Sequence, residues 1–164
     1  MPRIDYKTLQ DLEFPTVLQQ VSYNCVTEPG REKVLAIIPF GEFAEIIPEL
    51  ERVKEFTASF EGDNKIPNHG FDPIFRELRL LEIENSSLEI SGFRKILTIS
   101  ETTRILQKFF KKFEEFYIHL NSFSEEVHYT SIISEEINKR VDKYGEIKDE
   151  ASIELGTIRR RLNV

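Results

Sequence analysis

The amino-acid sequence predicts an all-α fold, a multi-helix bundle with one long helix and at most a short β stub near residues 144–148. Between the proline and glycine breaks, apolar residues recur at steps of three and four, which is the period of an amphipathic helix. The alternation of apolar and polar residues that marks a half-buried strand is nearly absent. The longest helix is expected over residues 88–120, where the apolar positions from Ile96 to Leu120 follow the helical period without a miss.

Three helices are predicted in the first half of the chain. Residues 14–25 carry one apolar stripe at positions i, i+3, i+4 and i+7. Pro29 suits the first turn of a second helix, which Pro39 ends. A third helix lies within residues 41–61, where Pro48 starts or kinks the helix.

The second half of the chain contains the long helix. Before it, Asp72 and Pro73 are expected to be the N-cap and first residue of a helix that reaches Leu81. A last short helix of this part covers residues 131–141. The seam of the long helix, which predicts packed neighbours on two sides, consists of Ile96, Ile99, Thr103, Leu106, Phe110, Phe113, Tyr117 and Leu120.

A turn and a final helix are predicted for the last 20 residues. Gly145 supplies the turn, and residues 146–148 form a short extended stub. The final helix begins at Ser152 and reaches Val164 without a glycine, proline or polar tail that would end it. We therefore expect the helix to continue in a longer protein.

Composition points to a globular protein of the cytoplasm. Of the 164 residues, 40% are hydrophobic and 31% are charged, and the longest apolar run is far too short to cross a membrane. Cys25 is the only cysteine, so an internal disulfide is excluded and a reducing compartment is expected. The net charge of −7 disfavours a polyanion as partner of the chain as a whole, although charge acts locally.

Motifs for catalysis are missing from the sequence. It has no phosphate-binding loop of the G-x-x-x-x-G-K-[ST] or G-x-G-x-x-G type, and no serine or cysteine beside a histidine. Glu125 and His128 have the Glu-x-x-His spacing of di-iron bundles, but the second copy that such a site needs is absent. We expect no catalytic, cofactor-binding or metal-binding residues, and no enzyme activity of this chain alone.

Two groups of basic residues are candidates for contacts with nucleic acid or with another domain. Arg104, Lys108, Lys111 and Lys112 fall at i, i+4, i+7 and i+8 on the long helix and form one stripe, while Arg159, Arg160 and Arg161 lie near the end of the final helix. Such side chains bind phosphates in a salt-dependent way that ignores sequence. The alternative interpretation is a solvated helix face that keeps the protein soluble.

The order of motifs resembles the amino-terminal region of the bacterial MutS-like proteins of the second type, over nearly all 164 residues. The resemblance depends on an opening pattern of Leu12, Glu13, Phe14, Leu18, Gly30, Arg31 and Pro39, and on a second pattern of Asp142, Gly145, Glu146, Ile147, Asp149, Ala151, Ser152, Glu154, Leu155, Ile158 and Arg159.

This resemblance implies a much longer parent protein. Residues 1–148 would be part of its helical core, and residues 149–164 would begin a lever helix that leads to a DNA clamp. An ATPase that binds ATP and Mg²⁺ and forms a homodimer would follow, and then a nuclease domain. The family is related to the mismatch-repair proteins but lacks their mismatch-reading domain. It is linked to suppression of homologous recombination through branched DNA, with no membrane involved.

The resemblance also leads to a hypothesis for this chain. The helices would act as a rigid block that couples the state of the ATPase to the clamp. The residues at the junction of core and lever would be the critical ones, namely Asp142, Gly145, Glu146, Asp149 and Ser152. Asp149 and Ser152 are also expected to cap helices, each contributing about 1 kcal/mol.

Two other functions remain open from the sequence. The same family could act on stalled ribosomes, with ribosomal RNA as the nucleic acid, because both backbones present phosphates. Alternatively, the chain could be a stand-alone helical module for protein interaction. This second alternative explains the composition but not the spacing of the second motif.

Overall fold

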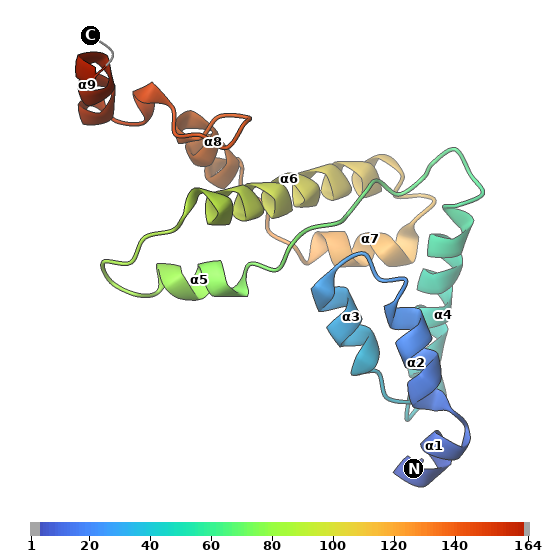
Figure 1. Cartoon of the computed structure of the whole chain (residues 1–164). Coiled ribbons are helices and arrows are strands. Elements are labelled where there is room, and N and C mark those ends of the chain that lie inside the picture. The colour runs from blue at the N-terminus through green and yellow to red at the C-terminus, as the bar shows by residue number, and fades with distance from the viewer. Residues whose placement is uncertain (1–3, 163–164) are drawn as a thin grey trace. The chain divides into compact units, whose positions relative to one another are not determined.

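The computed structural model describes residues 4–162 and confirms the all-α fold, with no strand among these residues (Figure 1). Its helices are α1 Tyr6–Asp11, α2 Phe14–Ser22, α3 Glu28–Leu35, α4 Phe43–Ala58, α5 Phe75–Leu81, α6 Ile90–Lys112, α7 Ile118–Glu125, α8 Ser131–Arg140, the 3-10 turn η1 Asp149–Ala151, and α9 Ile153–Leu162.

The chain forms two compact units, and the division falls within α6. Unit 1 contains the residues up to Phe71 together with Ile105–Val127, and unit 2 contains Asp72–Arg104 together with the residues from His128 on. None of the three boundaries, after residues 71, 104 and 127, coincides with residue 148. The division between a core and a lever at that residue stays a prediction.

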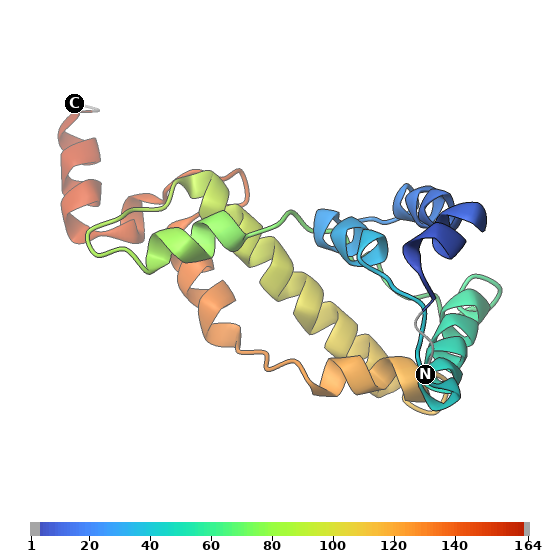
Figure 2. The same cartoon turned by 90° about the horizontal axis from the view of Figure 1, so that it is seen from below.

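Within unit 1, α2 packs against α3, and both views show the two helices side by side (Figures 1 and 2). Helix α3 begins as its sequence predicts, because the Thr27 hydroxyl accepts a 3.2 Å hydrogen bond from the Gly30 N–H and Pro29 lies in the first turn. It ends at Leu35, before Pro39. Pro48 lies inside α4 rather than at its start.

The long helix is shorter than predicted, because the chain turns at residues 113–117. The N–H groups of Phe116 and Tyr117 both donate to the Phe113 carbonyl, at 3.0 and 3.1 Å, and α7 begins only at Ile118. The Tyr117 ring lies 5.4 Å from the Phe109 ring and 5.8 Å from the Phe110 ring. Packing of the aromatic rings therefore stabilises the turn. The apolar spacing of the predicted seam continues through the turn because the side chains on both sides of it belong to one cluster.

A side chain of α4 caps the N-terminus of α7 and so joins the two helices. The Glu55 carboxylate of α4 accepts hydrogen bonds of 2.9 Å from the backbone N–H groups of His119 and Leu120. These groups belong to the first turn of α7, where N–H groups have no partner in their own helix. The negative charge also opposes the positive end of the α7 dipole.

Helix α5 in unit 2 begins two residues later than predicted. Ile74, with φ −117°, precedes the helix, and its carbonyl accepts the first helical hydrogen bond from the Leu78 N–H at 2.9 Å. Asp72 and Pro73 therefore lie outside the helix. Glu77 is buried on the inner side of α5, where its carboxylate pairs with Lys95 of α6 at 3.0 Å.

The β stub and the start of the last helix are confirmed. Val141 and Ile147 form an isolated antiparallel bridge, and α9 begins at Ile153 directly after Ser152. The prediction that the final helix reaches Val164 without an end signal falls on residues 163–164, outside the described residues.

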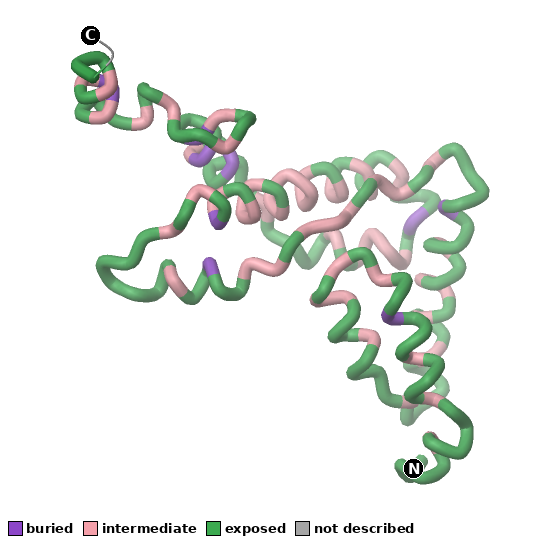
Figure 3. Tube along the Cα trace, in the orientation of Figure 1, coloured by how far each residue is buried: buried purple, intermediate pink, exposed green. Residues whose placement is uncertain are grey.

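Few side chains are buried. Among the described residues, the hydrophobic ones that are buried are Tyr117, Ile137 and Val141, and Figure 3 shows how sparse the buried positions are. The accessible surface is 13242 Å². Two separate globular proteins with as many residues as unit 1 and unit 2 would together expose only about 10,000 Å² of accessible surface. Much apolar surface of the helices is therefore still open to further packing.

Candidate functional site

The segment between α8 and α9 is the candidate functional site, and we call residues 141–152 the junction turn. Its two arms are paired through the backbone. The Asp142 N–H donates to the Glu146 carbonyl at 2.9 Å, and the Lys148 N–H donates to the Arg140 carbonyl at 2.8 Å. Together with the bridge of Val141 and Ile147, these bonds close a small antiparallel loop after α8.

Asp142 fixes the inside of this loop. One of its carboxylate oxygens, Oδ1, accepts hydrogen bonds of 2.8 Å from the backbone N–H groups of both Tyr144 and Glu146. Such a bond from the side chain to the residue two positions on is the usual way in which aspartate stabilises a turn. The hydrogen bond from the Glu146 N–H, as the largest contribution, lowers the pKa of Asp142 below its ordinary value.

Both the backbone conformation at position 145 and the side chain packed against it require a glycine. Its φ of +85° lies in the left-handed region that residues with a side chain rarely adopt. A Cβ atom at this position would lie 2.9 Å from Cδ and 3.0 Å from Nη1 of Arg94, which projects from α6. The junction turn thus packs its glycine directly on the Arg94 side chain.

Helix α9 is attached to the junction turn at three points. The Ser152 hydroxyl accepts a 3.1 Å hydrogen bond from the Leu155 N–H, so the predicted cap is confirmed. Gly156 is buried, and a Cβ there would lie 2.9 Å from the backbone oxygen of Asp149. Arg159 donates from Nη1 to the Ile147 carbonyl at 2.8 Å and to Asp149 Oδ1 at 2.5 Å.

The remaining predicted junction residues have different roles from those expected. Asp149 is wrong as a helix cap, because it lies within η1 and its carboxylate pairs with Arg159, not with a helix N–H. Glu146 contributes its backbone groups to the loop, while its side chain is exposed. Sequence reasoning missed Arg94, which has no local signal, and Gly156, whose place inside a helical pattern is itself a sign of close packing.

A hollow lies beside the junction turn within unit 2. Its volume is 390 Å³, and its lining is mainly apolar, from Leu88, Ile90, Phe93, Ile137, Val141, Ile147 and Ala151, with Glu136 and Arg140 as the charged members. Hydrogen bonds from Lys139 and then from Arg140 lower the pKa of Glu136 to about 2. The Glu136 carboxylate is therefore ionised at neutral pH, and burying an ionised group costs free energy. The apolar side chains are the part of this hollow that another helix or domain could cover.

Some of the predicted basic side chains are exposed, and others are half-buried or already hydrogen-bonded within the chain. On α6, Lys108, Lys111 and Lys112 are exposed in unit 1, while Arg104 is half-buried in unit 2. On α9, Arg161 is exposed, but Arg159 is bonded within the junction turn, and Arg160 donates from Nε to the Gly156 carbonyl at 3.0 Å. Their contacts with nucleic acid or other domains stay predictions.

Residues 4–162 contain neither a candidate metal site nor a candidate membrane span. This part of the chain brings together no group of three or more histidine, cysteine, aspartate or glutamate side chains that could hold a metal ion. Glu125 ends α7 and His128 follows that helix, so the two residues do not share a helix face. No helix described here is long and apolar enough to span a membrane.

Comparisons with known proteins find clear relatives, although no protein-family model matches the chain. Endonuclease MutS2 of Symbiobacterium thermophilum is 26% identical over 161 residues, which cover 98% of this chain and 20% of that protein. The MutS2 endonucleases of Bacillus velezensis and Thermotoga maritima are 28% and 31% identical, each over 95% of this chain and 20% of their own length. The chain is thus similar to MutS2 endonucleases over nearly its whole length, and it spans about one fifth of the length of the relatives that it matches.

Proposed function

We propose that the chain is a non-catalytic helical part of a MutS2-like protein, in which the junction turn transmits movement through α9 to a DNA clamp. In this proposal the longer protein binds ATP and Mg²⁺ in its own ATPase, acts as an endonuclease, and restrains homologous recombination by binding branched DNA. The support comes from the relatives, which are named endonucleases, and from the attachment of α9.

The observation that carries the proposal is the attachment of α9 by three contacts, two of which use Asp149. A hydroxyl cap stabilises a helix start by about 1 kcal/mol, and hydrogen bonds between charged groups are about twice as strong as neutral ones. The close approach of Gly156 to the Asp149 carbonyl adds a steric stop. An element held in this way moves as a body with its support, which is the property that a lever needs.

The test is Gly145→Val in a full-length MutS2-like protein that carries this segment. Valine is disfavoured at φ +85° and its Cβ would meet Arg94, so the junction turn should rearrange. We expect slower nucleotide-dependent release of branched DNA with unchanged ATP binding. Gly62→Val is the matched control, because a Cβ at Gly62 would make only ordinary van der Waals contacts, at 3.7 and 3.8 Å. Unchanged release in the Gly145 variant would refute the proposal.

The same protein allows DNA and ribosomes to be compared directly. Binding to four-way DNA junctions and to ribosomes, each titrated at one salt concentration, separates the two targets because phosphate contacts make both affinities depend on salt. We expect the four-way junction to bind more tightly. Tighter binding to ribosomes would make the ribosome, and not branched DNA, the target of the longer protein.

A further inference from the structure

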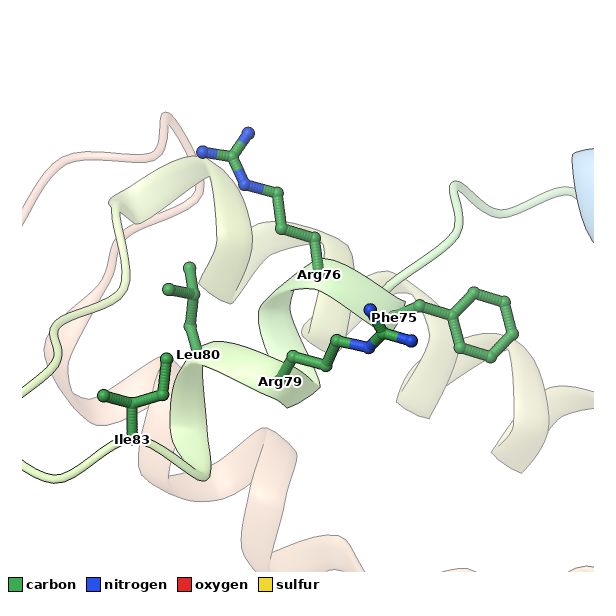
Figure 4. A pocket seen from close by; sticks show the side chains of 5 residues that line it. All are labelled: Phe75, Arg76, Arg79, Leu80 and Ile83. Carbon is green, nitrogen blue, oxygen red and sulfur yellow. The ribbon is translucent and has the colours of Figure 1, made fainter.

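Helix α5 presents one face that contacts little else in unit 2, and we call it the α5 face. Figure 4 shows its five side chains around a shallow hollow of 480 Å³. The first four fall at i, i+1, i+4 and i+5 and share one side of the helix, and the fifth follows two residues after the helix ends at Leu81. The members are Phe75, Arg76, Arg79, Leu80 and Ile83.

The charges of the α5 face are unpaired within the described residues. Arg76 and Arg79 are exposed, and neither forms an ion pair or a side-chain hydrogen bond there. Phe75 is 64% exposed and Ile83 is 58% exposed. Arginine beside aromatic and aliphatic side chains is the composition of the centre of protein interfaces.

A second surface, in unit 1, has the complementary composition, and we call it the α4 hollow. It has a volume of 700 Å³ at the start of α4 and is lined by Ile38, Pro39, Phe40, Gly41, Glu42, Glu45, Pro48, Glu49 and Arg52. Ile38 is 77% exposed and Phe40 is 50% exposed. Glu42 and Glu45 are exposed carboxylates.

Arg52, the single cationic side chain in the lining of the α4 hollow, already forms an ion pair. Arg52 pairs with Glu49, and its guanidinium lies over the Phe123 ring at 4.2 Å from the ring centre. The charges of Arg52 and Glu49 therefore cancel locally. Glu42 and Glu45 form the capping box of α4, in which each carboxylate accepts a backbone N–H, but no cation among the described residues pairs with either of them.

We propose that the α5 face of one copy of this chain docks into the α4 hollow of a second copy. Arg76 and Arg79 would meet Glu42 and Glu45, since the planar guanidinium forms paired hydrogen bonds with carboxylates. The apolar side chains of the α5 face would cover those of the hollow. Both patches are small, so the contact is a weak and reversible one.

The charge around α5 favours this partner over nucleic acid. Residues 72–84 contain four acidic residues and two basic ones, so the local net charge is −2. A nucleic acid carries a phosphate charge at every nucleotide, so its backbone would also meet the four acidic residues of this segment. The α4 hollow instead presents two carboxylates, which the two arginines alone can contact. The proposal does not depend on the function proposed above.

Charge reversal on either side gives a test with its own rescue. R76E/R79E makes both surfaces acidic, and E42K/E45K makes both basic, so each variant alone should self-associate at least 10-fold more weakly in sedimentation equilibrium of the 164-residue chain from 5 to 500 μM. An equimolar mixture of the two variants should restore association, because each acidic surface then finds a basic one.

Two controls keep the result interpretable. K111E/K112E changes the net charge by the same amount as R76E/R79E on exposed residues outside both surfaces, and it should associate like the unmodified chain. E45Q keeps the acceptor that the Glu42 N–H uses at 3.2 Å, and it should weaken association without loss of helix content. A chain that stays monomeric at 500 μM, or a mixture that fails to restore association, would overturn the proposal.

Discussion

Gly156→Ala is the sharpest test of how α9 is attached. A new Cβ would lie 2.9 Å from the backbone oxygen of Asp149, a distance that real Cβ atoms essentially never show. Because the neighbour is backbone, no flexible side chain can move aside. Either α9 shifts away from η1 or the junction turn deforms.

The size of the effect follows from two opposing contributions. Alanine favours a helix interior over glycine by about 1 kcal/mol, but this gain applies to α9 whether or not it is attached to the junction turn. The steric contact acts only on the attached state and costs about 1–3 kcal/mol, as overpacking does elsewhere. Attachment should therefore weaken about 5- to 150-fold while the helix itself becomes more stable.

Amide hydrogen exchange read by NMR measures this directly. The Ala151 N–H, bonded to the Lys148 carbonyl at 3.0 Å, and the Lys148 N–H should exchange faster, while the helix content from circular dichroism stays equal or rises. Gly41→Ala should leave both rates unchanged, because its Cβ has no neighbour within 4 Å. Unchanged exchange at these two amides in the Gly156 variant would refute the close approach of α9.

Three further predictions concern individual hydrogen bonds. Ser152→Ala should destabilise the first turn of α9 by about 1 kcal/mol, seen as faster exchange there, whereas Ser152→Asp should restore the cap. Carbon-13 titration should give Asp142 a pKa below the ordinary value of an aspartate. Because this pKa is lowered on folding, the contribution of Asp142 to stability is present above the unfolded pKa and is lost as the pH falls through the folded pKa. An ordinary pKa would contradict the two hydrogen bonds to Oδ1. Glu55→Ala should lower the melting temperature and expose the first turn of α7 to exchange, at a cost of about 1–2 kcal/mol, and unchanged exchange would show that α4 does not cap α7.

Local signals in the sequence predicted most of the helices. Thr27 and Pro29 place the start of α3, and Ser152 places the start of α9, because caps and proline act within a single turn of the chain. The same holds for Gly145 as the centre of a turn. Helix α1, which the apolar period did not reveal, also has a local cap, since Asp5 Oδ1 accepts from the Thr8 N–H at 2.8 Å.

The tertiary structure alone decided where the long helix ends. The apolar seam is continuous through residues 113–117, so the spacing cannot tell a helix from a turn whose side chains share the same cluster. The rings of Phe109 and Phe110 around Tyr117, and the capping of α7 by Glu55, make the turn more favourable than a longer helix. These contacts join residues up to 65 positions apart.

The candidate site divides in the same way. The sequence by itself determined the junction turn, because aspartate and glycine impose their backbone preferences wherever they stand. Only the tertiary structure assigned Arg94 as the support of Gly145, Gly156 as the contact of α9, and Asp149 as a partner of Arg159. Distances between elements depend on how helices pack against one another, and packing is a property of residues that the sequence separates.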